Sequence, residues 1–165
     1  MFTIVEDFYA DPDSVRDYAL SQNFNVSGNY PGLRTASCSN DGGYADSMQS
    51  SLGKIIGKTI THFPLDGYNT SFQYTTEEST TWIHHDAMSY AAVIYLTPNA
   101  PLDSGTAIYK HRQTGLSRHS PDAVLDFNEF QLVEGDWDIV GEAKNVYNSL
   151  VIYDVFPRAQ ITHRA

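Results

Sequence analysis

The order of the residue patterns predicts an α+β fold that is mainly β. In the first third of the chain, apolar residues recur at helical spacing, whereas from about residue 59 they alternate with polar residues at period two. Tyr (11) and Phe (8) are plentiful, as is typical of a β-rich core with aromatic packing. We therefore expect a barrel or sandwich of short strands with flanking N-terminal helices.

The chain begins with a predicted strand and two predicted helices. "FTIVEDF" alternates as a strand does, and "DPDSVRDYALSQ" follows as a helix in which Asp11 caps the free amides and Pro12 takes the first position. "NVSGNYPGLRT" reads as a loop with a Pro-Gly turn. A second helix is expected over 46–56, because its apolar residues fall on one side.

Short strands joined by Gly, Pro, Asn and Asp are expected over the rest of the chain. They are Thr59–Phe63, Ser71–Thr76, Thr81–Asp86, Tyr90–Thr97, Thr106–His111, Phe130–Val133, Trp137–Val140, Leu150–Tyr153 and Gln160–His163. The segment "SRHSPDAVLDFNEF" is expected to hold a short helix. Because no compositional break divides the 165 residues, we expect one domain over 1–165.

Charge and composition narrow the range of partners. The chain has 10 Lys and Arg against 20 Asp and Glu, a formal charge of -10, which argues against nucleic acid and anionic membranes as partners. No secretion signal and no long apolar run occurs, so we expect a cytoplasmic protein with no membrane partner. Cys38 is the single cysteine, which excludes an internal disulfide and a cysteine-rich zinc cluster.

The stretch "WIHHD" carries the chemistry of the chain. On a strand His84 and Asp86 share one face while His85 points to the other. A third metal ligand would come from His163, at the end of a late strand, or from His111. Two imidazoles and one carboxylate leave open positions on a metal, which is the arrangement of non-haem Fe(II) oxygenases. A hydrogen-bonded His–Asp pair without a metal remains the alternative interpretation.

The elements around this motif follow a recognisable order. A strand containing Tyr74 leads to H-x-D, followed by the strand with Tyr95-Leu96, a loop with Gly105, the returning strand "TAIYKHR" and the late strand "NSLVIYD". With the N-terminal "VEDFYADPDSVRDYAL" and "YPGLRT", this order resembles the 2-oxoglutarate/Fe(II)-dependent dioxygenase superfamily, particularly its small prolyl-hydroxylase-like members.

The resemblance implies a double-stranded β-helix, which is a jelly-roll barrel with the metal in its mouth. It implies that His84, Asp86 and His163 bind Fe(II) and that Tyr74 contacts the co-substrate 2-oxoglutarate. The implied reaction is hydroxylation of an aliphatic C–H on a peptidyl or small-molecule substrate. These are expectations for the structure and for experiment.

The co-substrate anchor departs from the pattern of the superfamily. There a basic residue on the strand after the distal histidine anchors 2-oxoglutarate, but here the sequence ends two residues after that histidine. We expect the barrel to lack its last strand, with a homo-oligomer covering the exposed edge, or the anchor to come from elsewhere. Lys110 and Arg112, on one face of the returning strand, are the first candidates, and Arg34 and Arg158 are further ones.

Two other functions stay open. A catalytically silent jelly-roll binding module would keep the barrel but lack the anchor. A cupin-like metal enzyme, such as an isomerase, would share the barrel, but its ligands usually form a multi-histidine set with a glutamate.

Overall fold

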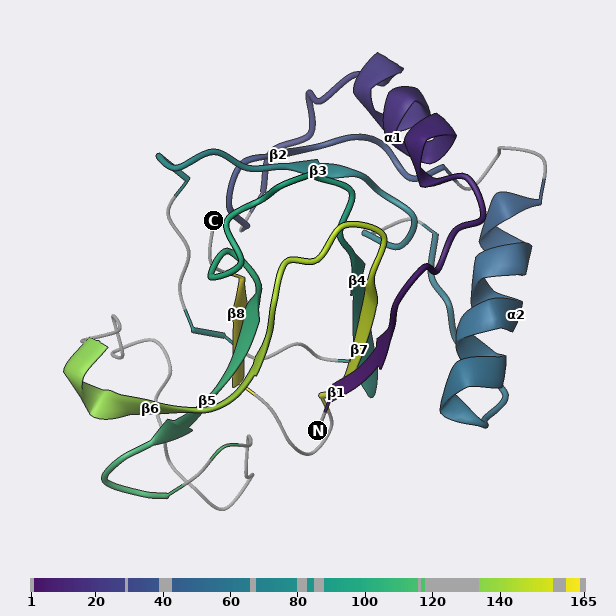
Figure 1. The fold of residues 1–165 in the computed structure, drawn as a ribbon. Helices are drawn as coiled ribbons and strands as arrows, with labels where there is room; N and C mark the ends of the chain where they lie inside the picture. Colours follow the sequence, from purple (N-terminus) through teal and green to yellow (C-terminus); the bar gives the residue numbers. More distant parts are fainter. Residues whose placement is uncertain are drawn as a thin grey trace. The chain divides into compact units, whose positions relative to one another are not determined.

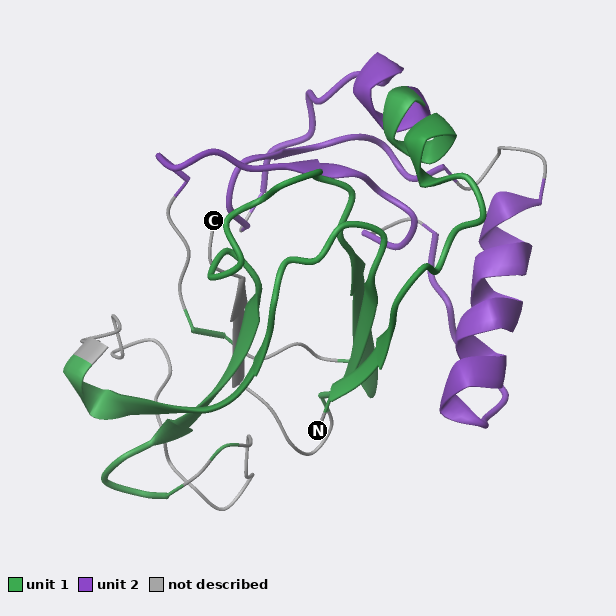
Figure 2. Cartoon of the chain, in the orientation of Figure 1, with its two compact units in different colours: residues 1–17, 80–165 green, residues 18–79 purple. Residues whose placement is uncertain are grey.

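The computed structural model describes residues 2–28, 30–38, 43–65, 68–79, 83–84, 88–115, 117, 134–155 and 160–163. The chain divides into two compact units, unit 1 with residues 1–17 and 80–165 and unit 2 with residues 18–79 (Figure 2). The boundary between the units falls inside helix α1 (Pro12–Ser21). The expectation of one domain over 1–165 stays a prediction.

Unit 1 contains a first antiparallel sheet built from three strands that are far apart in the sequence. These are β1 (Phe2–Val5), β4 (Tyr90–Ile94) and β7 (Leu150–Asp154), in the order β1-β7-β4 (Figure 1). The central strand β7 is apolar over most of its length, and Leu150 and Val151 are both 0% exposed. Central strands with buried faces read as continuous apolar runs, which explains "LVIY".

A second antiparallel sheet in unit 1 has the order β6-β5-β8. Its strands are β5 (Thr106–His111), β6 (Trp137–Ala143), which follows the 3₁₀ turn η1 (Glu134–Asp136), and β8 (Gln160–His163). β6 continues three residues beyond its predicted end, and a bulge in the β5–β6 ladder lets its 7 residues pair with the 6 residues of β5.

The hydrophobic core of unit 1 draws on both sheets. Ile108 of β5 and Ala143 of β6 pack in one buried cluster with Val151 and Tyr153 of β7. Along the chain, β4 lies in the first sheet, β5 and β6 in the second, β7 in the first and β8 in the second. The two sheets are therefore layers over a shared core (Figure 1).

Gly105 marks a close backbone approach in unit 1. A Cβ atom at this position would overlap the carbonyl oxygen of Ala143. Only glycine lets the loop before β5 approach the end of β6 so closely.

Unit 2 combines helix α2 with a very short ribbon. The ribbon pairs β2 (Leu33–Arg34) with β3 (Gln73–Tyr74), and α2 spans Tyr44–Ile56. The turn before β2 depends on Gly32, which has φ 72° and whose absent Cβ would overlap the carbonyl oxygen of Tyr74. The geometry of this turn, more than the length of the strands, thus determines how β2 and β3 pair.

Several predicted elements are confirmed. In α1 the Asp11 carboxylate accepts a bond of 3.1 Å from the Ser14 amide, as expected for a cap, and α2 begins two residues before its predicted start. The bonds from Ser14 also hold the pKa of Asp11 below its usual value. β5 and β8 have their predicted bounds. The described part of the chain is thus an α+β structure, mainly antiparallel sheet, with two helices and no closed barrel.

Other predicted elements differ or lie outside the described residues. The strand over Thr59–Phe63 is wrong, because the Ile60 carbonyl accepts a bond of 2.8 Å from the Gln49 side chain instead of pairing in a ladder. The strand over Ser71–Thr76 shrinks to β3, since β2 offers it only two partners. The helix in "SRHSPDAVLDFNEF" and the strand Phe130–Val133 lie outside the described residues, as does most of Thr81–Asp86.

In the described part of the chain, no helix is both long enough and apolar enough to cross a bilayer.

Candidate functional site

The H-x-D motif is described only in part. His84 follows Ile83 in extended backbone and is half-buried. Asp86 and His85 lie outside the described residues. The alternation that would give His84 and Asp86 a common face therefore stays a prediction.

The predicted third ligand, His163, ends strand β8, and the structure describes its backbone. In the antiparallel ladder between β5 and β8, His163 pairs with Thr106 and Ile161 pairs with Ile108. The strand that returns after H-x-D is therefore the neighbour of the strand that carries the distal histidine.

A pair of buried hydroxyl groups lies beside this register position. Tyr95 Oη and Thr106 Oγ1 are 2.6 Å apart, and both residues are buried. Burial raises the pKa of the Tyr95 hydroxyl, and its hydrogen bond with Thr106 opposes this only in part. Thr106 and Ile108 occupy alternate positions of β5, so the hydroxyl pair is on the face that meets the core.

Sequence reasoning missed this hydroxyl pair. The sequence marks Tyr95 only as part of a strand pattern and Thr106 only as the first residue of a strand. A signal was present, because a tyrosine directly follows the apolar strand β4 and a threonine opens β5. Nothing in the sequence, however, indicates that these two strand ends meet.

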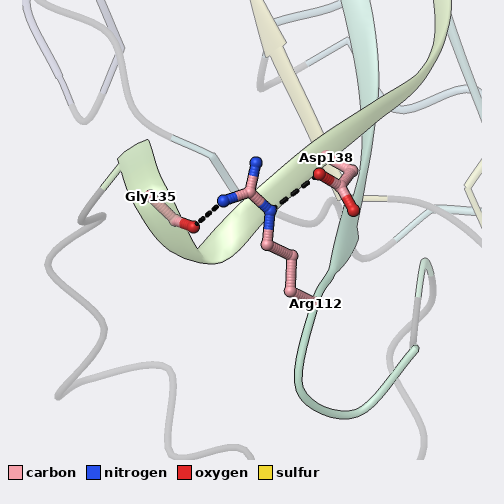
Figure 3. A network of polar contacts seen from close by, with 3 residues as sticks. All are labelled: Arg112, Gly135 and Asp138. Carbon is pink, nitrogen blue, oxygen red and sulfur yellow. Dashed lines mark hydrogen bonds and ion pairs between the residues drawn. The ribbon is translucent and has the colours of Figure 1, made fainter.

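The two first candidates for the co-substrate anchor have different surroundings. Lys110 is half-buried and shares the Thr106 and Ile108 face of β5 by strand alternation. Arg112 lies just beyond β5, where its Nε donates to Asp138 Oδ1 at 2.7 Å and its Nη1 donates to the Gly135 carbonyl (Figure 3).

The Arg112 ion pair is exposed, with side chains 55% and 47% accessible. Such a pair contributes only about 0.2–1 kcal/mol, but it gives the guanidinium a carboxylate partner before any ligand arrives. Lys110 is therefore the better placed of the two cations.

The remaining candidates lie in unit 2 or outside the described residues. Tyr74 belongs to β3 of unit 2, is 52% exposed, and meets the Phe24 ring at a centroid distance of 6.0 Å. Arg34 belongs to β2 of the same unit. Arg158 lies outside the described residues. A co-substrate role for Tyr74 stays a prediction.

His111, the alternative third ligand, is buried and packs against other side chains. It is 3% exposed, its Nδ1 lies 3.0 Å from Thr114 Oγ1, and its ring meets Trp137 at 4.9 Å. Alternation along β5 puts it on the opposite face from Thr106. His111 is thus separated by the sheet from the buried hydroxyl pair.

Among the described side chains, no three His, Cys, Asp or Glu residues form a group that could hold a metal. The predicted triad is not represented among them, since Asp86 lies outside the described residues and His163 is described by its backbone alone.

Comparison with known families places most of the chain in a described family. The model of a family described as "Family of unknown function (DUF6445)" matches residues 1–155. The chain belongs to this family. The DUF6445 match includes the H-x-D motif and ends before β8. No curated protein and no solved structure matches the chain significantly.

Proposed function

We propose that this DUF6445 chain is a non-haem Fe(II)- and 2-oxoglutarate-dependent dioxygenase that hydroxylates an aliphatic C–H. Its substrate would be a peptidyl residue or a small molecule. The observation that carries the proposal is the register of β8 on β5, which pairs His163 with Thr106.

This register supports an inward position for the distal histidine. Residues opposite one another in an antiparallel ladder belong to the same face of the sheet. Thr106 belongs to the face of β5 that carries Ile108 into the core. By register, position 163 shares the face of Thr106, which supports its proposed role as a ligand.

The path of the chain supports a jelly-roll arrangement of the two sheets. A jelly roll is a pair of antiparallel sheets between which the chain crosses repeatedly. Here the chain crosses three times between two sheets that share one core, from β4 to β5, from β6 to β7 and from β7 to β8. The finer assignment as a double-stranded β-helix belongs to this proposal.

The donor set fits the implied metal. Two imidazole nitrogens and one carboxylate oxygen suit Fe(II), and three protein ligands leave positions for co-substrate and O₂. His84, Asp86 and His163 would hold the metal. Bound iron would supply the chemistry that couples O₂ and 2-oxoglutarate to C–H hydroxylation.

The chain's own residues would position the co-substrate. Tyr95 and Thr106 offer hydroxyl groups in a buried setting near the distal-histidine register. The Tyr95 hydroxyl is protonated at neutral pH and can donate to a carboxylate oxygen, and burial, which raises its pKa, further favours the protonated form. Lys110, on the same face of β5, would supply the positive charge.

The competing proposal is a silent jelly-roll binding module. The observation that favours it is the Arg112–Asp138 pair, which neutralises one of the two anchor candidates (Figure 3). A cupin-like enzyme has no observation of its own in its favour.

Anaerobic titration of the purified chain with Fe(II), followed by addition of 2-oxoglutarate and O₂, tests the proposal. We expect one bound iron per chain and formation of succinate even without a prime substrate. Failure to bind Fe(II) would rule out the proposal, whereas iron binding without succinate would favour another metal-dependent reaction.

Variants sharpen this test. His84→Ala, Asp86→Ala and His163→Ala should each abolish iron uptake, while His85→Ala should retain it because alternation turns that residue outward. Loss of uptake in all four variants would contradict the alternation argument. His111→Ala tests the alternative ligand and should leave iron uptake unchanged in the folded protein.

A further inference from the structure

Strand β3 of unit 2 is at the edge of its ribbon, because among the described strands it pairs only with β2 (Figure 1). Arg34 of β2 lies opposite Gln73 of β3, yet its amide and carbonyl exchange two bonds of 2.9 Å with Val26 on the far side of β2. Next in the ladder, the Thr35 amide donates to the Phe72 carbonyl at 3.0 Å. Arg34 and Gln73 are therefore a pair without mutual backbone bonds, and the amide and carbonyl of Gln73 point away from β2.

The outer edge of β3 carries unpaired backbone groups. Alternation of the ladder, taken one step past Tyr74, turns the amide and carbonyl of Thr75 outward like those of Gln73. In the part of the chain that the structure describes, these backbone groups of Gln73 and Thr75 form no hydrogen bond. All residues from 73 to 78 are exposed. Two donors and two acceptors are therefore open along one edge, which proteins usually cover or interrupt.

An apolar surface accompanies this edge. Leu33 and Tyr74 lie opposite one another in the ribbon and are 41% and 52% exposed. The Tyr74 ring meets the Phe24 ring at a centroid distance of 6.0 Å. A strand added beside β3 would place every second side chain on the face of Tyr74, where an apolar side chain could pack.

The turn that follows β3 is acidic. The Ser79 amide donates to the Thr76 carbonyl at 2.9 Å and the Thr76 amide donates to Ser79 Oγ at 3.0 Å, so the extended edge ends at Thr76. Glu77 and Glu78 occupy this turn, are exposed and form no ion pair with a described residue. Because the whole chain has a formal charge of -10, this edge repels a second copy and attracts a cationic segment.

We propose that the outer edge of β3 binds an extended, basic peptide segment of a partner protein by strand addition. The backbone of the segment pairs with Gln73 and Thr75, which provides affinity. An apolar side chain of the segment packs on Tyr74, and Lys or Arg residues at one end lie near Glu77 and Glu78, which provides specificity. This surface belongs to unit 2 alone and does not rest on the proposed iron chemistry.

The probe is the capped peptide acetyl-Lys-Lys-Val-Thr-Val-Thr-Val-amide. Its lysines come first because an antiparallel strand begins beside the turn that follows β3. The peptide is titrated into the ¹⁵N-labelled, metal-free full chain at constant ionic strength. We expect saturable shifts of the Gln73 and Thr75 amide resonances and, at saturation, about tenfold or slower hydrogen exchange of both amides. Shifts that stay linear with peptide concentration would overturn the proposal.

Two altered peptides separate strand addition from attraction by charge. In the first, proline replaces both threonines and removes the amides that would donate to the Gln73 and Thr75 carbonyls, so binding should weaken about tenfold or more. In the second, glutamate replaces both lysines, and binding should weaken severalfold, with a difference that shrinks as salt is added. Unchanged affinity for the proline peptide would overturn strand addition. Unchanged affinity for the glutamate peptide would overturn the assignment of a basic partner.

Variants at Thr75 test the edge itself. Thr75→Pro removes the outward amide and should weaken binding about tenfold, whereas Thr75→Val keeps the amide and should bind as the wild type does. Wild-type affinity in Thr75→Pro, or equal weakening in both variants, would overturn the proposal. The amide spectrum reports whether unit 2 remains folded, and the proline peptide makes the same test on the wild-type chain if Thr75→Pro does not fold.

The double variant Glu77→Gln and Glu78→Gln should weaken binding of the lysine peptide severalfold. Its matched control is Asp103→Asn with Glu142→Gln, which removes the same charge from exposed positions of unit 1 and should leave binding unchanged. Equal weakening in the control would mean that net charge attracts the peptide, and would overturn the proposed site. In the free chain, slower exchange of the Gln73 and Thr75 amides at higher protein concentration would show that a second copy covers the edge, and would also overturn the proposal.

Discussion

Different interactions stabilise the interior of each of the two units of this chain. Unit 1 buries apolar strands, and β7 is nearly inaccessible from Leu150 to Tyr153. Unit 2 has a ribbon of two-residue strands whose residues Leu33 and Tyr74 are exposed, and it relies on side-chain hydrogen bonds and turns. Burial specifies the first unit, whereas turn chemistry and polar contacts specify the second.

Substituting one glycine in each unit should give the largest contrast. Gly105→Ala in unit 1 would drive a Cβ into the Ala143 carbonyl, and we expect a loss of more than about 3 kcal/mol. Gly43→Ala in unit 2 meets no atom within 4 Å and should cost about 1–2 kcal/mol, from its φ of 82° alone. Urea unfolding measures both, and equal losses would contradict the steric argument.

Leucine truncations should show a smaller difference in the same direction. Leu150→Ala removes a fully buried side chain between two strands and should cost about 4 kcal/mol. Leu52→Ala, on the buried side of α2, should cost about 2 kcal/mol. The free energy of unfolding decides between them, and a larger loss at Leu52 would show that unit 2 also depends mainly on burial.

Asn148 is a polar exception within unit 1. Its amide group accepts from the Tyr9 amide and donates to the Tyr9 carbonyl, both at 2.9 Å, and its φ is 60°. Asn148→Ala should cost about 2–3 kcal/mol, since it removes both bonds and adds backbone strain.

Asn148→Gly separates these two contributions, because glycine keeps the positive φ without strain and lacks the amide. Stability should then lie between wild type and Asn148→Ala. If the glycine variant is as stable as wild type, the hydrogen bonds to Tyr9 contribute nothing.

In unit 2, Gln73→Leu should have a modest effect of about 1 kcal/mol, because it removes an exposed hydrogen bond from Arg34 and a partly buried one to the Pro31 carbonyl. It should also broaden the Arg34 Nε–Hε signal, since the side chain loses its in-plane restraint. An unchanged signal would indicate that other contacts of Arg34, among them the rings of Tyr30 and Tyr68, are enough to hold the guanidinium.

The smallest effect is a pH dependence at the surface of unit 1. The Tyr147 hydroxyl donates to Asp13, and this bond with the nearby carboxylate raises the Tyr147 pKa from 10.0 to about 12. A raised pKa means that this contribution to stability is fully present below about pH 10 and is lost as pH rises through about 12.

Tyr147→Phe should therefore remove a small loss of stability in this alkaline window and change little at neutral pH. Urea midpoints between about pH 9 and 12 measure it against wild type. Because both groups are exposed, a large change at neutral pH would contradict this interpretation.

Local sequence determined many elements of both units. The cap at Asp11 fixed the start of α1, and alternation gave β5 and β8 their bounds. These elements depend on neighbouring residues, whose propensities and spacing are visible in the sequence. The predicted strand Thr59–Phe63 was wrong because the Gln49 side chain of α2 donates to the Ile60 carbonyl. No local pattern in the sequence shows this contact.

In the candidate site, too, local sequence predicts some features and contacts between distant segments decide the others. The sequence alone predicted the ligand set, His84, Asp86 and His163, and the possible anchors, and these stay predictions. Only the tertiary structure decided that β8 pairs with β5, that Tyr95 meets Thr106, that Asp138 engages Arg112 and that His111 lies on the opposite face. Propensity and periodicity act between neighbours in the chain, whereas these pairings join distant segments whose loop-closure cost is recovered only by burial in the whole fold.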